Sequence, residues 1–305
     1  MKIKTELLDE IIRFCKIESG ETLPLKESGE NTGISCERYE ILSDEDSEKY
    51  GKPKGIYDIF GIPNALTLTK KQKANIMSEI TKSLKELCAT VDNKSKILVV
   101  GLGNRHISSD SLGTLVCRKI CITLGLKNYP NVMAICPSVL GLTGIETYDT
   151  IRGIVDRVKP SQVIFIDSLC ASDVSRLGTS IQLSNTGICP GSGVKNKRKC
   201  LDKSICKNVV SIGVPLLIYA STFLENSFEK NGIDLLRLNS IMQSAKKERN
   251  KDEILELIKD IKKVYNDDVL NIIVSHKDIK EMVEILSDII AGAINKSLGV
   301  AELKE

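Results

Sequence analysis

Four uninterrupted apolar segments recur along the middle of the chain, and they constrain its fold more than any other feature. They cover residues 96–100, 132–136, 162–166 and 209–214. Residues 111–124 and 148–158, which lie between them, have the apolar spacing of helices. Strands that are apolar on both faces must be covered on both faces, as happens when helices connect parallel strands. The pattern therefore predicts an α/β fold, with a mainly parallel sheet flanked by helices.

The remaining sequence divides into an N-terminal part and a larger remainder. Residues 1–46 are polar and acidic and carry one amphipathic helix pattern, so we expect them to form an appendage. Residues 47–305 then form a single α/β domain that ends in helices. Within this scheme we predict a long surface helix over residues 69–91, and a strand pair around residues 36–42 and 55–60.

The composition excludes several classes of protein. The chain is 42% hydrophobic and 27% charged, with 43 Lys and Arg against 40 Asp and Glu, which is the balance of an ordinary globular protein. A net charge of +3, the absence of Trp and an aromatic content of 4% argue against direct nucleic-acid binding. No segment has the length and hydrophobicity of a membrane span or a signal peptide. We therefore expect neither nucleic acid nor a membrane as a partner.

The cysteines and histidines point to a reduced protein without a metal. Most of the ten cysteines lie within apolar runs and none belongs to a Cys-x-x-Cys pair, which is typical of buried thiols. The only histidines, His106 and His276, have no His or Cys partner at a ligand spacing, so we expect no metal site. The chain is therefore expected to be cytoplasmic, with its thiols reduced.

The loop after the first apolar strand holds the first candidate for chemistry. Ligands of open α/β sheets bind beyond the carboxyl ends of the strands, and this loop runs from Gly101 to Asp110. Its Gly-x-Gly start also occurs in dinucleotide-binding loops, but His106 replaces the third glycine, so we expect no cofactor. Asp110 either caps the helix that follows or faces the crevice at the end of the sheet.

A second carboxylate, Asp167, directly follows the apolar run 162–166. Burial there raises the pKa of a carboxyl group and suits it to donate a proton, whereas capping the next turn is the structural alternative. If the two strands are neighbours, Asp110 and Asp167 share a crevice in which an ionised carboxylate activates water and a protonated one assists the carbonyl or the leaving amine. Asn104 and Glu146 are candidate supporting residues, although Glu146 at a helix start also suits the helix dipole.

Four motifs, in order along the chain, resemble those of the spore germination protease family. They are Gly101-Leu-Gly103-Asn104 with Asp110-Ser-Leu-Gly113, Gly141-Leu-Thr-Gly144-Ile-Glu146-Thr147, Ile166-Asp167-Ser-Leu169, and Thr186-Gly187 with Pro190-Gly191-Ser192-Gly193 and the basic run that ends at Lys199. The resemblance extends over nearly the whole chain. It implies an atypical aspartic endopeptidase that degrades small acid-soluble spore proteins during germination, with Asp110 and Asp167 as its catalytic pair.

The same resemblance implies further properties. They are a fold similar to the hydrogenase-maturation peptidases, a homotetramer, a location in the cytoplasm of the spore core, no cofactor, and a zymogen that loses an N-terminal propeptide. Because Lys4-Thr5-Glu6-Leu7 is similar to the start of the processed form, we expect either no N-terminal activation or latency through residues 1–46.

The chain departs from the family motifs close to the aspartates, at Ser172, Asn185, Cys189 and Tyr219. Two alternatives therefore stay open. One is a catalytically silent family member that binds spore proteins. The other is a peptidase like those of hydrogenase maturation, against which the shortage of histidines argues.

Overall fold

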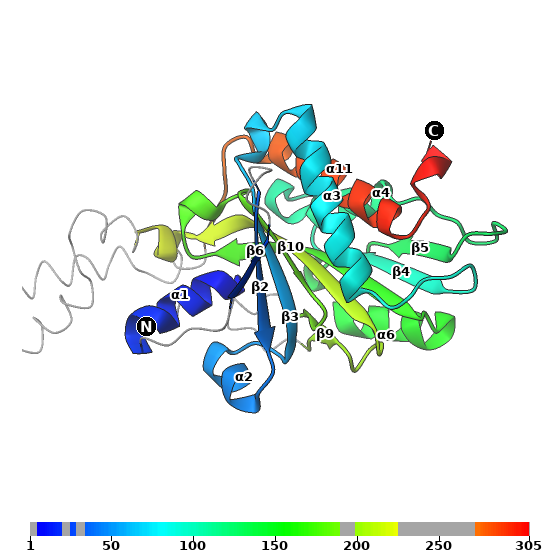
Figure 1. Ribbon diagram of the computed structural model, residues 1–305, viewed down its shortest axis with the longest axis horizontal. Coiled ribbons are helices and arrows are strands. Elements are labelled where there is room, and N and C mark those ends of the chain that lie inside the picture. Colours follow the sequence, from blue (N-terminus) through cyan, green and yellow to red (C-terminus); the bar gives the residue numbers. More distant parts are fainter. Residues whose placement is uncertain (1–4, 20–24, 29–33, 190–198, 225–271, 305) are drawn as a thin grey trace, which may run out of the picture.

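The computed structural model describes residues 5–19, 25–28, 34–189, 199–224 and 272–304, and its centre is one large sheet (Figure 1). The strands are β1 (Leu25–Ser28), β2 (Ser35–Ile41), β3 (Gly55–Gly61), β4 (Lys96–Gly101), β5 (Asn131–Ile135), β6 (Gln162–Ala171), β7 (Ser180–Ser184), β8 (Gly187–Ile188), β9 (Leu201–Asp202), β10 (Val209–Tyr219) and β11 (Ile273–Val274). Nine of them form a sheet in the order β1-β2-β3-β7-β10-β6-β4-β5, with β11 paired to β10; β8 and β9 pair separately.

The sheet has a parallel half and an antiparallel half. Strands β5, β4, β6 and β10 are parallel neighbours. Beyond them the pairing is antiparallel, between β10 and β7, β7 and β3, β3 and β2, and β2 and β1. The predicted α/β fold is thus confirmed for its central strands, and the complete sheet is mixed. The four parallel strands include all four uninterrupted apolar segments of the sequence.

Helices cover the sheet on both faces. They are α1 (Leu8–Ser19), α2 (Asp44–Tyr50), α3 (Lys70–Leu87), α4 (Leu112–Arg118), α5 (Leu140–Thr143), α6 (Thr147–Val158) and α11 (Ile279–Ser297), with short 3-10 turns η1 (Ala65–Thr67), η2 (Ser108–Asp110), η3 (Val174–Arg176) and η4 (Ala301–Lys304). Helix α3 begins at a capping box formed by Thr69 and Gln72, and its buried positions Ile76, Ile80 and Leu84 recur every fourth residue. None of the helices within the described ranges is both long and apolar enough to cross a membrane.

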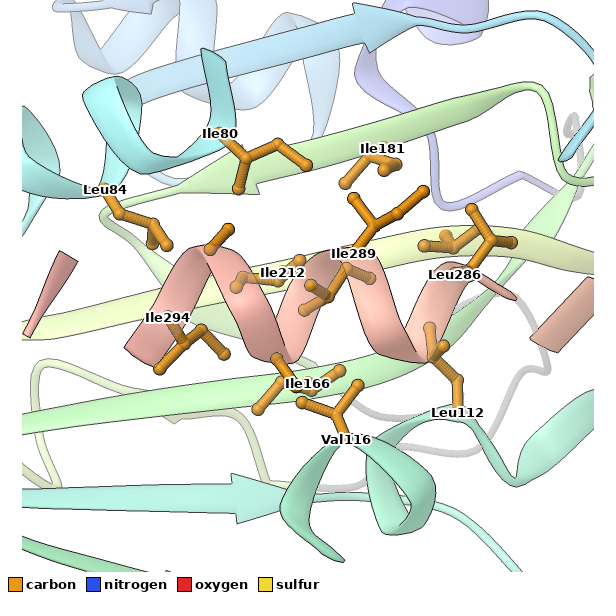
Figure 2. Packing of buried hydrophobic residues seen from close by; sticks show 14 of the residues in the cluster. Ile80, Leu84, Leu112, Val116, Ile166, Ile181, Ile212, Leu286, Ile289 and Ile294 are labelled. Atoms are coloured by element: carbon orange, nitrogen blue, oxygen red, sulfur yellow. The ribbon is translucent and has the colours of Figure 1, made fainter. Parts of the chain in front are cut away.

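One hydrophobic cluster joins three helices to the sheet. Figure 2 shows Ile80 and Leu84 of α3, Leu112 and Val116 of α4, and Leu286, Ile289 and Ile294 of α11 around Ile166, Ile181 and Ile212 of three strands. Burial of each such side chain stabilises the fold by about 1.5–3 kcal/mol. Helix α6 covers the opposite face, where Ile151 and Val155 pack against Phe165. Because helices pack on both faces of the parallel strands, these strands are apolar on both sides.

The predicted division at residue 46 does not appear in the structure. Strand β2 pairs along its whole length with β3, and Ile41 lies with Leu8 of α1 and Tyr57 of β3 in one buried cluster. Without β2, strand β3 would expose a row of unpaired backbone groups at the edge of the sheet. Residues 35–41 therefore belong to the main sheet. Three parts of the predicted appendage, residues 1–4, 20–24 and 29–33, lie outside the described residues.

Two element boundaries differ from the sequence-based prediction. Strand β6 continues to Ala171 because β10 also continues, to Tyr219, and pairs with it there. Helix α4 ends at Arg118 instead of residue 124. The residues that follow it bond to other elements: the Thr123 N–H donates to the carbonyl of Val132, and the Cys121 N–H donates to the side chain of Asn295.

Candidate active site

A cavity of about 710 Å³ lies at the carboxyl ends of β4 and β6, and both predicted aspartates line it. Asp110 comes from the loop between β4 and α4, and Asp167 comes from β6 itself. Because β4 and β6 are hydrogen-bonded neighbours and β4 ends first, the loop after β4 meets the continuing strand β6 at this end of the sheet. The structure thus brings Asp110 and Asp167 into one crevice, as the sequence predicted.

Asp110 is held by its own loop and does not cap the helix. Its Oδ2 accepts the backbone N–H of Asn104 at 2.8 Å, whereas the N-cap residue of α4 is Ser111, which makes no side-chain cap bond. Gly103 has φ +96°, and a Cβ at this position would collide with the backbone oxygen of Asp110 and lie 2.7 Å from its Oδ1. The glycine therefore allows the loop to fold back on itself and hold the carboxylate at the crevice.

Asp167 lies inside β6, not at its end. The last pair between β4 and β6 joins Gly101 to Ile166, so Asp167 is the first residue of β6 beyond the end of β4. On its other side it pairs with Gly213 of β10. Its side chain is only 8% exposed, and its Oδ1 accepts the N–H of Ser168 at 2.9 Å.

The surroundings of Asp167 favour its protonated form. Burial raises its pKa well above the ordinary value, and the negative charges of Asp110 and Glu6 raise it further, against the opposing effect of the Ser168 N–H bond. Asp110, by contrast, is only half-buried and accepts an N–H bond, an interaction that is stronger for an ionised carboxylate. The crevice thus holds two aspartates in unequal environments.

Glu6 is a third carboxylate of the crevice that the sequence analysis did not identify. Its N–H donates to the carbonyl of Cys170 at 2.9 Å, and its Oε2 accepts the N–H of Cys170 at 2.8 Å, so the residue lies against the end of β6. Lys52 donates to its carbonyl at 2.7 Å. No local pattern could have found Glu6, because its partners lie far away along the chain.

Ser168 is a second residue that the sequence analysis did not single out for chemistry. Its side chain lines the crevice and is only 7% exposed, and its hydroxyl has no hydrogen-bond partner among the described residues. Buried hydroxyls are nearly always paired in folded proteins. This hydroxyl is therefore a buried polar group beside the crevice whose hydrogen-bonding capacity is not used by the described residues.

The two candidate supporting residues differ in their placement. Asn104 lies next to Asp110 and binds it through its backbone, while its side chain accepts the N–H of His106 at 2.9 Å. Glu146 is exposed, does not line the crevice and occupies the N-cap position of α6 without a side-chain cap bond. Asn104, which like Glu146 is not among the residues that line the crevice, therefore touches the site only through its backbone bond to Asp110, and Glu146 lies at the helix start.

The residues that depart from the family motifs have individual structural roles. Tyr219 lines the crevice, the Ser172 N–H donates to Glu10, and Asn185 accepts the N–H of Ile56 at 2.9 Å. Cys189 forms a disulfide with Cys200, which corrects the expectation that all thiols are reduced. The disulfide forms because the pairing of β8 with β9 brings these two cysteines together. Residues 190–198, which carry most of the fourth motif, lie outside the described residues.

No three His, Cys, Asp or Glu side chains in the described ranges are grouped so that they could hold a metal ion. The crevice contains three carboxylates, but Asp110 and Glu6 are already bound to backbone N–H groups. The carboxyl groups that line the crevice are those of Asp110, Asp167 and Glu6.

Sequence comparisons with known proteins show the family. The model of the germination protease family matches residues 16–231. The germination protease of Caldanaerobacter subterraneus subsp. tengcongensis is 34% identical, over 97% of this chain and 94% of that protein. The germination protease of Clostridium acetobutylicum is also 34% identical, over 96% and 94%. Among solved structures, the hydrogenase maturation protease HycI of Thermococcus kodakarensis matches 70% of this chain and 99% of its own, with 15% identity and a TM-score of 0.36.

Proposed function

Since this chain belongs to the germination protease family, we propose that it is an endopeptidase that hydrolyses peptide bonds with Asp110 and Asp167 as its catalytic pair. The observation that carries this proposal is the crevice of about 710 Å³ that both aspartates line. In this crevice, burial and two neighbouring charges raise the pKa of Asp167. Two carboxyl groups with unequal proton affinities are what acid–base hydrolysis of an amide requires.

Under this proposal each aspartate has one task. The ionised Asp110 accepts a proton from a water molecule, whose oxygen attacks the peptide carbonyl. Asp167 enters the reaction protonated and donates its proton to the carbonyl oxygen or to the leaving amine. After product release, transfer of a proton from Asp110 to Asp167 restores the starting state.

The proposed substrates are small acid-soluble spore proteins, degraded during germination. Support comes from the motif resemblance and from relatives named germination proteases that align over nearly the full chain. On the same basis we propose a homotetramer made as a zymogen in the cytoplasm of the spore core.

The test is cleavage of a purified spore protein by the wild type and by Asp110→Asn and Asp167→Asn. We expect each variant to lose activity by about 10²–10⁴-fold, because each lacks one proton-transfer group. Asp149→Asn, on the exposed surface of α6, is the matched control and keeps full activity. Wild-type protein that binds the substrate without cleaving it would instead identify a silent family member. Near-normal turnover by either crevice variant would reject the catalytic pair.

A further inference from the structure

A second cavity, of about 530 Å³, adjoins the crevice. Gly103 and Ser138 line both cavities, so they form the boundary between them. The second cavity is also lined by Cys136, which directly follows β5 and is exposed. The proposed peptidase chemistry makes no use of this thiol.

Cys136 is paired with a second thiol, that of Cys117. Cys117 is buried on α4, and its sulfur lies 3.6 Å from the carbonyl oxygen of Ile135, the residue before Cys136. The Cys136 sulfur lies 4.0 Å from the carbonyl oxygen of Thr114, one turn before Cys117. The two thiols also interact with each other, and this interaction shifts their pKa values in opposite directions.

This arrangement favours the reactive form of Cys136. The hydrogen bond from Cys117 lowers the pKa of Cys136 to about 7, with help from the positive charge of Arg118 and in spite of partial burial. The thiolate is the nucleophilic form of cysteine, so much of the protein is reactive at neutral pH. Burial and the neighbouring thiolate raise the pKa of Cys117, which stays protonated as the hydrogen-bond donor.

The charged residues of the cavity are cationic. Arg118 enters it from α4, and Arg105 and His106 enter it from the loop after β4. Arg105 donates a hydrogen bond to Nε2 of His106 at 3.2 Å, and the two arginines supply positive charge to the cavity. No acidic side chain is among the lining residues in the described part of the chain, and Leu142 and Thr143 on the remaining side are uncharged. A ligand that carries carboxylates is therefore favoured here.

We propose that Cys136 is a site of reversible S-thiolation by small anionic disulfides, whose carboxylates bind Arg105 and Arg118. In this reaction the Cys136 thiolate attacks one sulfur of the disulfide, and the disulfide bond breaks. A mixed disulfide forms on Cys136, and the other half leaves as a thiolate that takes up a proton. A free thiol reverses the reaction by attack on the mixed disulfide.

The position of the site couples it to the crevice. Gly103 packs directly on Asp110 and also lines the cavity beside Cys136. A tripeptide-sized group bound there extends past Gly103 and Ser138 and blocks the entry of a peptide substrate. This effect on activity rests on the proposed function, whereas the modification itself does not.

The test uses the full chain with glutathione disulfide as the anionic probe and cystamine as the cationic one, followed by intact mass and peptide mapping. We expect one glutathione adduct on Cys136, formed about 10-fold faster or more than the cystamine adduct. Cys136→Ser abolishes the adduct, and the control Cys15→Ser on α1 retains it. Arg118→Gln slows the reaction with glutathione disulfide by about 5-fold and leaves the reaction with cystamine equal or faster.

Other outcomes would overturn the proposal. They are a mass loss that corresponds to an internal disulfide, an adduct on another cysteine, or equal rates for the two probes. If the spore-protein assay works, the adduct lowers cleavage and a reducing agent restores it. Cys136→Ser, treated in the same way, controls for reduction of the disulfide between Cys189 and Cys200. The adduct is measured by mass, so failure of the proposed peptidase function leaves this measurement unaffected.

Discussion

At the scale of single residues, Asp167 is the most consequential side chain. It lies in a strand whose other residues, after Gln162 at its start, are apolar or small, and burial opposes its ionisation. The negative charges of Asp110 and Glu6 act in the same direction. A carboxyl group in this position keeps its proton at a pH at which exposed aspartates have lost theirs.

Replacement of Glu6 by Gln should shift the pH dependence of catalysis. The change removes a negative charge that raises the pKa of Asp167, while the amide oxygen can still accept the N–H of Cys170. The pKa of Asp167 then falls, and the alkaline limb of kcat/KM against pH moves to lower pH. Glu45→Gln, at an exposed position of α2, leaves the profile unchanged. An unshifted limb would show that Glu6 does not act on Asp167.

Asp167→Asn should stabilise the fold at neutral pH. The pKa of Asp167 is higher in the folded protein than in the unfolded chain. The stability that this group contributes to the wild type is therefore complete below the pKa of the unfolded chain, where the carboxyl group is protonated in both states. This contribution is lost as the pH rises through the pKa of the folded protein. Asparagine cannot ionise and escapes this loss. Thermal unfolding at several pH values should give Asp167→Asn a higher Tm than the wild type at neutral pH. This difference in Tm should disappear in acid. A lower Tm at neutral pH would contradict this expectation.

At the scale of elements, the loop between β4 and α4 determines where Asp110 lies. The loop is packed so closely that Gly113, at the start of α4, leaves no room for a Cβ beside the carbonyl oxygens of Ile166 and Leu102. Gly103 adds a left-handed conformation to the same tight packing. The close packing of the loop on itself and on β6 therefore explains the glycines of this motif.

Gly103→Ala should impair the site more than the fold. Its positive φ and the collision with Asp110 should cost about 1–2 kcal/mol of stability and displace the carboxylate. Urea unfolding and spore-protein cleavage measure the two effects. Gly153→Ala is the control, because this glycine lies within helix α6 with open space around it, so alanine should stabilise by about 0.5–1 kcal/mol. Full activity of Gly103→Ala would mean that the loop can hold Asp110 without this glycine.

At the scale of the whole molecule, the N-terminal segment and the centre of the sheet form one structure. Helix α1 packs on β2 and β3, while Thr5 to Glu10 bind the end of β6 and the following turn. The crevice thus receives Glu6 from one end of the chain and Ile279 from near the other.

Leu8→Ala should destabilise the entire protein. Leu8 is fully buried, and its truncation should cost about 2–5 kcal/mol. Because β2 is part of the main sheet and α1 packs on it, denaturant unfolding of Leu8→Ala should remain one transition with a lower midpoint. The same result is expected for Ile289→Ala in the central cluster. A separate early transition in Leu8→Ala alone would support an independent N-terminal unit.

Much of the fold and half of the crevice follow from local sequence. The parallel strands were predictable because each is a continuous apolar run, and the two aspartates stood out because they follow such runs. Neighbouring parallel strands place their carboxyl ends together, so topology alone brought Asp110 and Asp167 to one edge.

Only the tertiary structure decided the rest. The pairing of β3 with β7, the extension of β6 by β10, the contact of Glu6 with Cys170 and the pairing of Cys117 with Cys136 all join segments without a shared periodic pattern. Periodicity reports which face of an element is buried, but it does not report which distant segment covers that face. The charges that raise the pKa of Asp167, and those that surround Cys136, are set by such contacts and become visible only in the folded chain.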